Sequence, residues 1–237
     1  MAIPQFPVYL FDVDGTLLDS AADICGAIQQ VLSPHLAAPL EFEYLRSFIG
    51  YHLDVCFREI LPDFSREQLD DLIHQYRSVY SGRGHSSTKL YPGVKEVLEI
   101  LPGRKSTATT KGTPTTRIVL EMFGLLPHFD HVQGTDGFPC KPAPDVLLRS
   151  IEALGARPED CLFVGDSAAD MEAGRRAGIR TCAVLYGYGS EKDLANWSPD
   201  YWISHPRELT QARLAETFSG AQLSADNRRH RRESSGR

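Results

Sequence analysis

Two carboxylates, Asp12 and Asp14, end an apolar run in the stretch Val8-Tyr-Leu-Phe-Asp-Val-Asp-Gly-Thr-Leu-Leu-Asp19. The apolar residues before Asp12 are typical of a short buried strand, and Gly15 then turns the chain. Because alternate residues of a strand point to the same side, we expect Asp12 and Asp14 to face one small site.

Two carboxylates in one small site repel each other unless a cation lies between them. Their oxygens suit a hard ion such as Mg²⁺. One carboxylate can attack a phosphoryl group and form an aspartyl-phosphate, while the other moves protons. A strand end followed by an Asp-Gly turn is the simpler alternative, and this motif alone does not decide between the two interpretations.

Strand-like runs recur along the chain and alternate with helical patterns. We expect strands at residues 8–12, 105–109, 131–134, 161–164 and 181–185, and helices at residues 114–123, 144–154 and 168–177. This alternation predicts an α/β fold with a Rossmann-like parallel sheet and helices on both faces. Ligands bind at the carboxyl ends of the strands in such sheets, where Asp12, Asp14, Thr109 and Asp166 fall.

One long region, from about residue 19 to residue 86, shows no strand. Its amphipathic patterns predict helices at residues 20–32, 42–49, 54–61 and 66–80. A helical insert directly after the first strand would lie over that strand's carboxyl end and can act as a lid; helices simply packed on the core are the alternative. We expect an α/β core at residues 1–17 and 89–225, a helical cap at 18–88 and a disordered basic tail at 226–237.

Two further motifs carry phosphate-binding groups at expected strand ends. Thr109 or Thr110, with the N–H groups of the following turn, can bind phosphate at a helix N-terminus. Lys141 precedes Pro142, so its backbone is extended, and it lies just ahead of a helix that begins near Pro144. A lysine held there can neutralise a phosphate or a pair of carboxylates, although a solvated surface lysine is the commoner case.

The last motif is Gly165-Asp166-Ser-Ala-Ala-Asp170, again at the end of a buried-looking strand. Asp166 can reach a metal ion. Asp170 lies about one helical turn further on and can support the metal or the lysine from behind. An N-cap followed by an acid in the first helical turn is the alternative for this motif.

The four motifs, in this order, resemble the haloacid dehalogenase-like hydrolase superfamily. The matching residues are Asp12-x-Asp14-Gly15-Thr16, Thr109, Lys141 and Gly165-Asp166-Ser167-x-x-Asp170. The helical insert is similar to that superfamily's helical cap. Three later segments, around residues 186–190, 199–201 and 205–209, resemble phosphoglycolate phosphatases and their near relatives.

The resemblance implies roles for these residues. Asp12 would attack phosphorus, and Asp14 would protonate the leaving alcohol and then activate water. Mg²⁺ would be held by Asp12, the carbonyl of Asp14, and Asp166. Thr109 and Lys141 would stabilise the equatorial phosphoryl oxygens, which is the positioning that phosphoryl transfer needs.

Two positions remain open. Relatives often carry Thr-Asn-Lys where this chain has Thr109-Thr110-Lys111, so Thr110 is a second candidate for the substrate-binding hydroxyl. In the insert, Arg46 lies near a loop around Gly50 and can pair with a substrate carboxylate. A surface arginine is the alternative interpretation.

The function that these observations favour is a Mg²⁺-dependent phosphatase of a small phosphorylated metabolite, with 2-phosphoglycolate among the candidates. A phosphomutase acting on a sugar phosphate, similar to beta-phosphoglucomutase, would use the same aspartyl-phosphate. A receiver-like signalling module also clusters carboxylates on a parallel sheet. Receivers, however, place the acidic pair and the phosphorylated aspartate on different strands, unlike Asp12 and Asp14.

The composition of the chain indicates in which cellular compartment the protein works and which partners it has. The 237 residues carry a formal net charge of −6 and five cysteines with no Cys-x-x-Cys pattern. We therefore expect a cytoplasmic protein with reduced thiols that binds neither nucleic acid nor a membrane. We expect no signal peptide, because the N-terminal apolar stretch carries two aspartates and has no basic flank, and no membrane span, because no apolar run approaches the roughly 20 residues that one needs. We expect a monomer or a homodimer.

Overall fold

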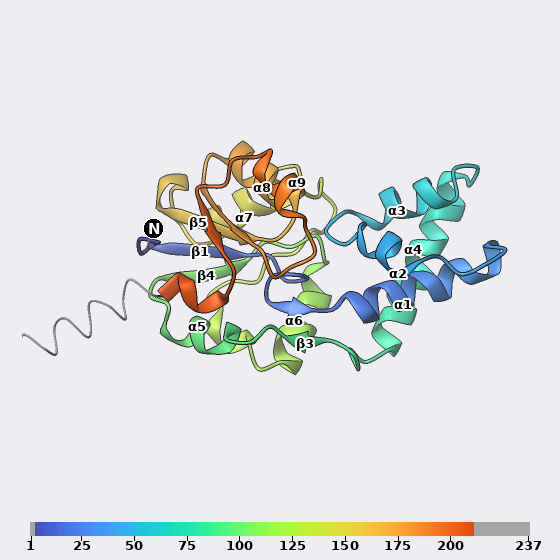
Figure 1. Cartoon of the computed structure of the whole chain (residues 1–237), viewed down its shortest axis with the longest axis horizontal. Coiled ribbons are helices and arrows are strands. Elements are labelled where there is room, and N and C mark those ends of the chain that lie inside the picture. Colours follow the sequence, from blue (N-terminus) through green and yellow to red (C-terminus); the bar gives the residue numbers. More distant parts are fainter. Residues whose placement is uncertain (1–2, 211–237) are drawn as a thin grey trace, which may run out of the picture.

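A five-stranded parallel sheet forms the centre of the larger part of the molecule (Figure 1). The computed structural model describes residues 3–210, so residues 211–225 of the expected core and the expected tail at 226–237 lie outside the described residues. The strands, in spatial order, are β4 (Arg104–Thr107), β1 (Val8–Phe11), β5 (Cys161–Gly165), β6 (Arg180–Val184) and β7 (Tyr201–Ile203). Strand β1 lies between β4 and β5, where the strand order changes direction. In open sheets this is the place where a ligand crevice forms.

Helices cover both faces of the sheet (Figure 1). They are α5 (Val94–Ile100), α6 (Thr113–Met122), α7 (Asp145–Ala153), α8 (Ala168–Ala177) and the short α9 (Glu191–Ala195). Alternate residues of β1 separate the two apolar layers: Tyr9 and Phe11 share a buried cluster with α5 and α6, and Val8 and Leu10 share one with α7 and α8. The expected α/β fold is confirmed.

One expected strand is absent from the described residues. Residues 131–134 make only an isolated bridge from His131 to Ser106. The reason is that a side chain replaces the backbone ladder: the Thr107 hydroxyl donates to the Gln133 carbonyl and accepts from the Gln133 N–H, each at 2.9 Å. Strand β7, by contrast, was not expected, because its three residues are too few to show a pattern.

Four helices form a separate body beside the sheet, which we call the cap (Figure 1). They are α1 (Ala21–Leu32), α2 (Phe42–Arg46), α3 (Leu53–Ile60) and α4 (Arg66–Gly82). The cap has its own buried cluster, built mainly from α1 and α4. Ser65 is the N-cap of α4 and forms a reciprocal capping box with Gln68.

The connections to the cap contain a short antiparallel pair, β2 (Leu18–Asp19) and β3 (Lys89–Leu90). This corrects the expectation of an insert without strands that directly follows β1. The outgoing and returning segments run side by side, so their backbone groups can pair with each other. Among the helices within residues 3–210, none combines the length and the apolar character that crossing a membrane requires.

Candidate active site

The ends of β1 and β5 bring two buried carboxylates together. Asp12 follows β1 and its N–H donates to the Val164 carbonyl at 2.9 Å, while Asp166 follows the neighbouring β5. Three residues after Asp12 the chain turns at Gly15, whose φ is +87° and which lies against Asp166. A Cβ at Gly15 would collide with the Asp166 carboxylate, so glycine is required there for space as well as for conformation.

Lys141 is enclosed by acceptors behind these carboxylates. Its side chain is buried, and Nζ lies 2.8 Å from Asp12 Oδ1, 2.5 Å from Asp170 Oδ1 and 3.1 Å from the Ala108 carbonyl oxygen. Burial by itself would lower the pKa of Lys141, but Asp12 and Asp170 outweigh it and raise the pKa. The lysine is therefore charged, and its three donors have three acceptors.

One oxygen each of Asp12, Asp166 and Asp170 lies within 4.8 Å of the others. Three buried carboxylates thus lie together, and the buried ammonium group of Lys141 pairs with two of them, Asp12 and Asp170. Burial raises the pKa of Asp12 to about 6, and burial together with Asp170 and Asp12 raises the pKa of Asp166 well above its ordinary value. A divalent cation would offset this excess negative charge, and an all-oxygen donor set suits Mg²⁺. The residues present fit such an ion.

Asp170 also has a structural task. Its Oδ2 accepts from the N–H of Ser167 at 2.9 Å and from the Ser167 hydroxyl at 2.7 Å, which caps α8. Its other oxygen faces Lys141. Asp170 therefore does both things considered from the sequence: one oxygen supports Lys141, and the other accepts hydrogen bonds at the first turn of α8.

Asp14 lies apart from the buried triad, on the side that faces the cap. The Ser20 hydroxyl donates to its Oδ1 at 2.5 Å, and Lys111 Nζ lies 3.1 Å from its Oδ2. Lys111 also donates to the Tyr80 hydroxyl of α4 at 2.9 Å. Burial opposes the charge of Lys111, but Asp14 and Tyr80 outweigh it and raise its pKa. Asp14 is thus held by one core lysine that also touches the cap.

Sequence reasoning missed Lys111, because only the hydroxyls of its motif were interpreted. Thr109 is buried after β4, and its Oγ1 accepts from the Lys111 N–H at 3.4 Å. Thr110 donates its hydroxyl proton to the carbonyl of Gly50, in the cap, at 2.9 Å. This differs from the expected substrate-binding role, since the Thr110 proton is committed to the cap loop.

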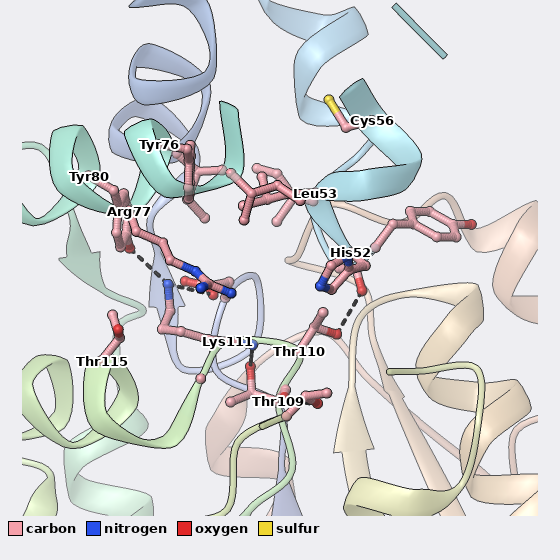
Figure 2. A pocket seen from close by; sticks show the side chains of 18 of the residues that line it. His52, Leu53, Cys56, Tyr76, Arg77, Tyr80, Thr109, Thr110, Lys111 and Thr115 are labelled. Atoms are coloured by element: carbon pink, nitrogen blue, oxygen red, sulfur yellow. Dashed lines mark hydrogen bonds and ion pairs between the residues drawn. The ribbon is translucent and has the colours of Figure 1, made fainter. Parts of the chain in front are cut away.

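A cavity of about 1100 Å³ separates the core from the cap. Asp12, Asp14 and core residues 109–112 and 135–139 line one wall. Cap residues 48–53 and one face of α4 line the other. Figure 2 shows Thr109, Thr110 and Lys111 on one side of this space and Tyr80, Arg77 and His52 around the other.

Arg46 does not line this cavity. It lies on α2, its side chain is half-buried, and it pairs with Glu43, three residues earlier, at 2.8 Å. The expectation that Arg46 faces the substrate is therefore corrected. Arg77 of α4 lines the cavity instead, and the spacing of Ile73, Tyr76, Arg77 and Tyr80 on one helical face is the signal that would have found it.

A glycine-rich loop closes over Asp166 from the sheet side. A Cβ at Gly187 or Gly189 would collide with Asp166, so this loop can approach only with glycines there. Tyr188, between them, donates its N–H to Asp166 Oδ2 at 2.8 Å. The Tyr188 hydroxyl accepts from the N–H of Ser20 at 2.7 Å, which ties the loop to the start of the cap.

Comparisons with known proteins agree with this architecture. A family model described as haloacid dehalogenase-like hydrolase matches residues 9–184. A phosphoglycolate phosphatase of Aquifex aeolicus is 33% identical over 208 residues, which are 86% of this chain and 95% of the relative. One from Nitrosospira multiformis is 34% identical over 211 residues, 85% of this chain and 93% of the relative. The crystal structure of a predicted phosphatase from Clostridium acetobutylicum matches with a TM-score of 0.82 at 28% identity, covering 90% of this chain and 100% of that one.

Proposed function

The chain belongs to the haloacid dehalogenase-like hydrolases, and from this premise we propose that it is a Mg²⁺-dependent phosphatase that works through an aspartyl-phosphate on Asp12. It is a hydrolase of phosphoric monoesters. The observation that carries the mechanism is the position of Asp12, directly after the interior strand β1, beside Asp166 and 2.8 Å from the buried ammonium of Lys141. We infer a small phosphorylated metabolite as the substrate, with 2-phosphoglycolate as the first candidate.

In the first step, a carboxylate oxygen of Asp12 attacks phosphorus while the bond from phosphorus to the leaving oxygen breaks. Asp14 gives a proton to that oxygen, so that a neutral alcohol leaves. Lys141 holds Asp12 in place and supplies positive charge for the phosphoryl oxygens, and the Thr109 hydroxyl faces the same wall of the cavity.

In the second step, water attacks the phosphorus of the aspartyl-phosphate, and Asp14 takes up its proton. Inorganic phosphate leaves and the Asp12 carboxylate is restored. Asp12, Asp166 and the Asp14 carbonyl would hold Mg²⁺. When bound, Mg²⁺ would neutralise charge on the phosphoryl oxygens and on the carboxylates.

The test is multiple-turnover release of inorganic phosphate from a panel of monoesters that includes 2-phosphoglycolate, sugar phosphates and an aryl phosphate. We expect release with Mg²⁺, loss in excess chelator, and recovery when Mg²⁺ is restored. Transfer of the phosphoryl group back to a sugar without net phosphate release would favour a phosphomutase. Full activity in excess chelator would contradict the metal requirement.

A further inference from the structure

The cap wall of the cavity carries two hydrogen-bond donors that the reaction scheme leaves unused. Arg77 extends from α4, and His52 lies at the N-cap of α3. Figure 2 shows both side chains in the cavity, with the Arg77 guanidinium and the His52 ring pointing toward one another. They face the wall that holds Asp12 and Asp14, so a group bound between them would lie at the far end of a substrate whose phosphoryl group is at Asp12.

Arg77 differs from every other arginine of the cap. The others each have a carboxylate partner: Arg46 pairs with Glu43, Arg58 with Asp54, Arg66 with Asp54 and Asp70, and Arg83 with Asp23. Within residues 3–210, Arg77 has neither an ion pair nor a hydrogen bond, although it lines a cavity. An arginine is always charged at physiological pH, so this wall presents an uncompensated positive charge.

His52 contributes a donor without a charge. Its Nδ1 accepts from the N–H of Asp54 at 3.2 Å and so caps α3. Because Nδ1 is the acceptor, the ring proton lies on Nε2, which is free to donate. Burial lowers the pKa of His52 and outweighs the opposing effect of Asp54, while the positive charges of Arg77 and Arg66 lower it further, so the neutral ring is favoured.

The core holds this wall in place. The Thr110 hydroxyl donates to the Gly50 carbonyl at 2.9 Å, two residues before His52. Gly50 has a φ of +98°, a conformation that favours glycine, so the loop turns sharply at the contact. His52 is thereby fixed relative to Thr110 and the phosphoryl-binding wall.

We propose that Arg77 and His52 form a carboxylate-binding subsite, which selects phosphate monoesters whose leaving alcohol carries a carboxylate group. A guanidinium presents a planar pair of donors that matches a carboxylate. One uncompensated positive charge beside a neutral imidazole balances one carboxylate, whereas a second phosphate would bring up to two negative charges. Lys111 and Arg66 also line the cavity, but Lys111 is paired with Asp14, and Arg66 with Asp54 and Asp70. This inference rests on the proposed phosphatase function and names its substrate class.

The experiment compares 2-phosphoglycolate with ethyl phosphate, which has the same chain length and no carboxylate. The measured quantity is the ratio of the two kcat/KM values. In Arg77→Met, which keeps the length of the side chain and removes the charge, we expect this ratio to fall by roughly 10- to 100-fold, as for a lost charge-assisted hydrogen bond. Most of the loss should be a rise in KM for 2-phosphoglycolate. Arg77→Lys should restore part of the ratio.

Two further variants control the result. Arg46→Met removes a cap arginine that pairs with Glu43 outside the cavity, and it should leave the ratio unchanged. His52→Asn keeps a side-chain oxygen that can cap α3 but removes the Nε2 donor, and it should lower the ratio by a smaller factor than Arg77→Met. Thermal unfolding of each variant checks that the fold is retained, which the exposed position of Arg77 favours.

The outcomes separate the two proposals. If the wild-type protein releases phosphate from no monoester in the panel, the proposed function fails. If it hydrolyses monoesters but Arg77→Met leaves the ratio unchanged, the subsite alone is overturned. A fall in the ratio for Arg46→Met equal to that for Arg77→Met would also overturn the subsite, because the effect would then be a general loss of positive charge on the cap.

Discussion

The two walls of the cavity hold their charged side chains in different ways. On the core wall, the charged side chains are paired: Asp12 Oδ1 lies 2.8 Å from the buried ammonium of Lys141, and Lys111 Nζ lies 3.1 Å from Asp14 Oδ2. On the cap wall, Arg77 is exposed to the cavity and has no partner among the described residues. A buried charge that already has a partner cannot adapt to different ligands. An exposed charge without a partner can bind a charged group of a ligand. We infer that the core wall carries the chemistry and the cap wall the selection.

The strongest test of this comparison is Asp12→Asn. The amide is nearly isosteric but is not a nucleophile toward phosphorus, so turnover should fall by at least ~10³-fold for every substrate, whatever its leaving group. Circular dichroism and thermal unfolding would verify that the variant is folded. Near-normal phosphate release from folded Asp12→Asn would show that the chemistry lies elsewhere.

The second test is Asp14→Asn, which removes the proton donor and leaves its carbonyl in place. We expect a loss of ~10²–10⁴-fold for alkyl phosphates, because proton transfer typically contributes that much. The loss should shrink for aryl phosphates, whose leaving groups need no proton. An equal loss across leaving groups of different pKa would mean that Asp14 only positions other groups.

The third test compares the stability of the two walls. Lys141→Met leaves Asp12 and Asp170 without their shared ammonium group in a buried site, and it should lower the free energy of unfolding by about 3–5 kcal/mol. Arg77→Met, at an exposed position, should change it by at most about 0.5 kcal/mol. Urea unfolding of both variants measures the difference. Equal destabilisation would contradict the distinction drawn between the walls.

The fourth test concerns the contact between the walls. Thr110→Val removes the hydroxyl that donates to the Gly50 carbonyl at 2.9 Å, while Thr110→Ser retains it. Loss of one neutral hydrogen bond is worth about 1 kcal/mol, so KM for 2-phosphoglycolate should rise a few-fold in the valine variant alone. If valine and serine behave alike, this hydrogen bond does not hold the cap loop in place.

The smallest expected effect is a pH dependence of the cap. Burial lowers the pKa of His52 below 6.5 in the folded chain, so the unfolded chain binds that proton more readily. The contribution of His52 to stability is therefore present above pH 6.5 and is lost as the pH falls toward the folded value, since a proton on Nδ1 would remove the acceptor that caps α3. Urea midpoints of the wild type should drop relative to His52→Asn between pH 7.5 and pH 5. Parallel pH curves would contradict this shift.

The local order of residues was sufficient to predict the main strands and helices of the core. Strands with continuous apolar residues, such as those before Asp12 and Asp166, are recognisable because burial on both faces leaves a run with no polar position. The four helices of the insert were also predicted, since their apolar spacing follows the helical period. The segment at residues 131–134 carries one apolar side chain, Val132, and does not form a strand. Its backbone pairs instead with the Thr107 side chain, 26 residues earlier for Gln133.

In the candidate site, too, the sequence predicted some features and the tertiary structure alone decided others. Asp12, Asp14, Asp166 and Lys141 could be named from the sequence, since each follows or precedes an element whose end is visible in the pattern. Tertiary packing alone decided which charges meet: that Lys141 joins Asp12 to Asp170, that Lys111 joins Asp14 to Tyr80, and that Arg77 rather than Arg46 faces the cavity. The physical reason is that a motif specifies backbone direction over a few residues, whereas the partner of a long charged side chain depends on how two separate bodies, core and cap, are placed against each other.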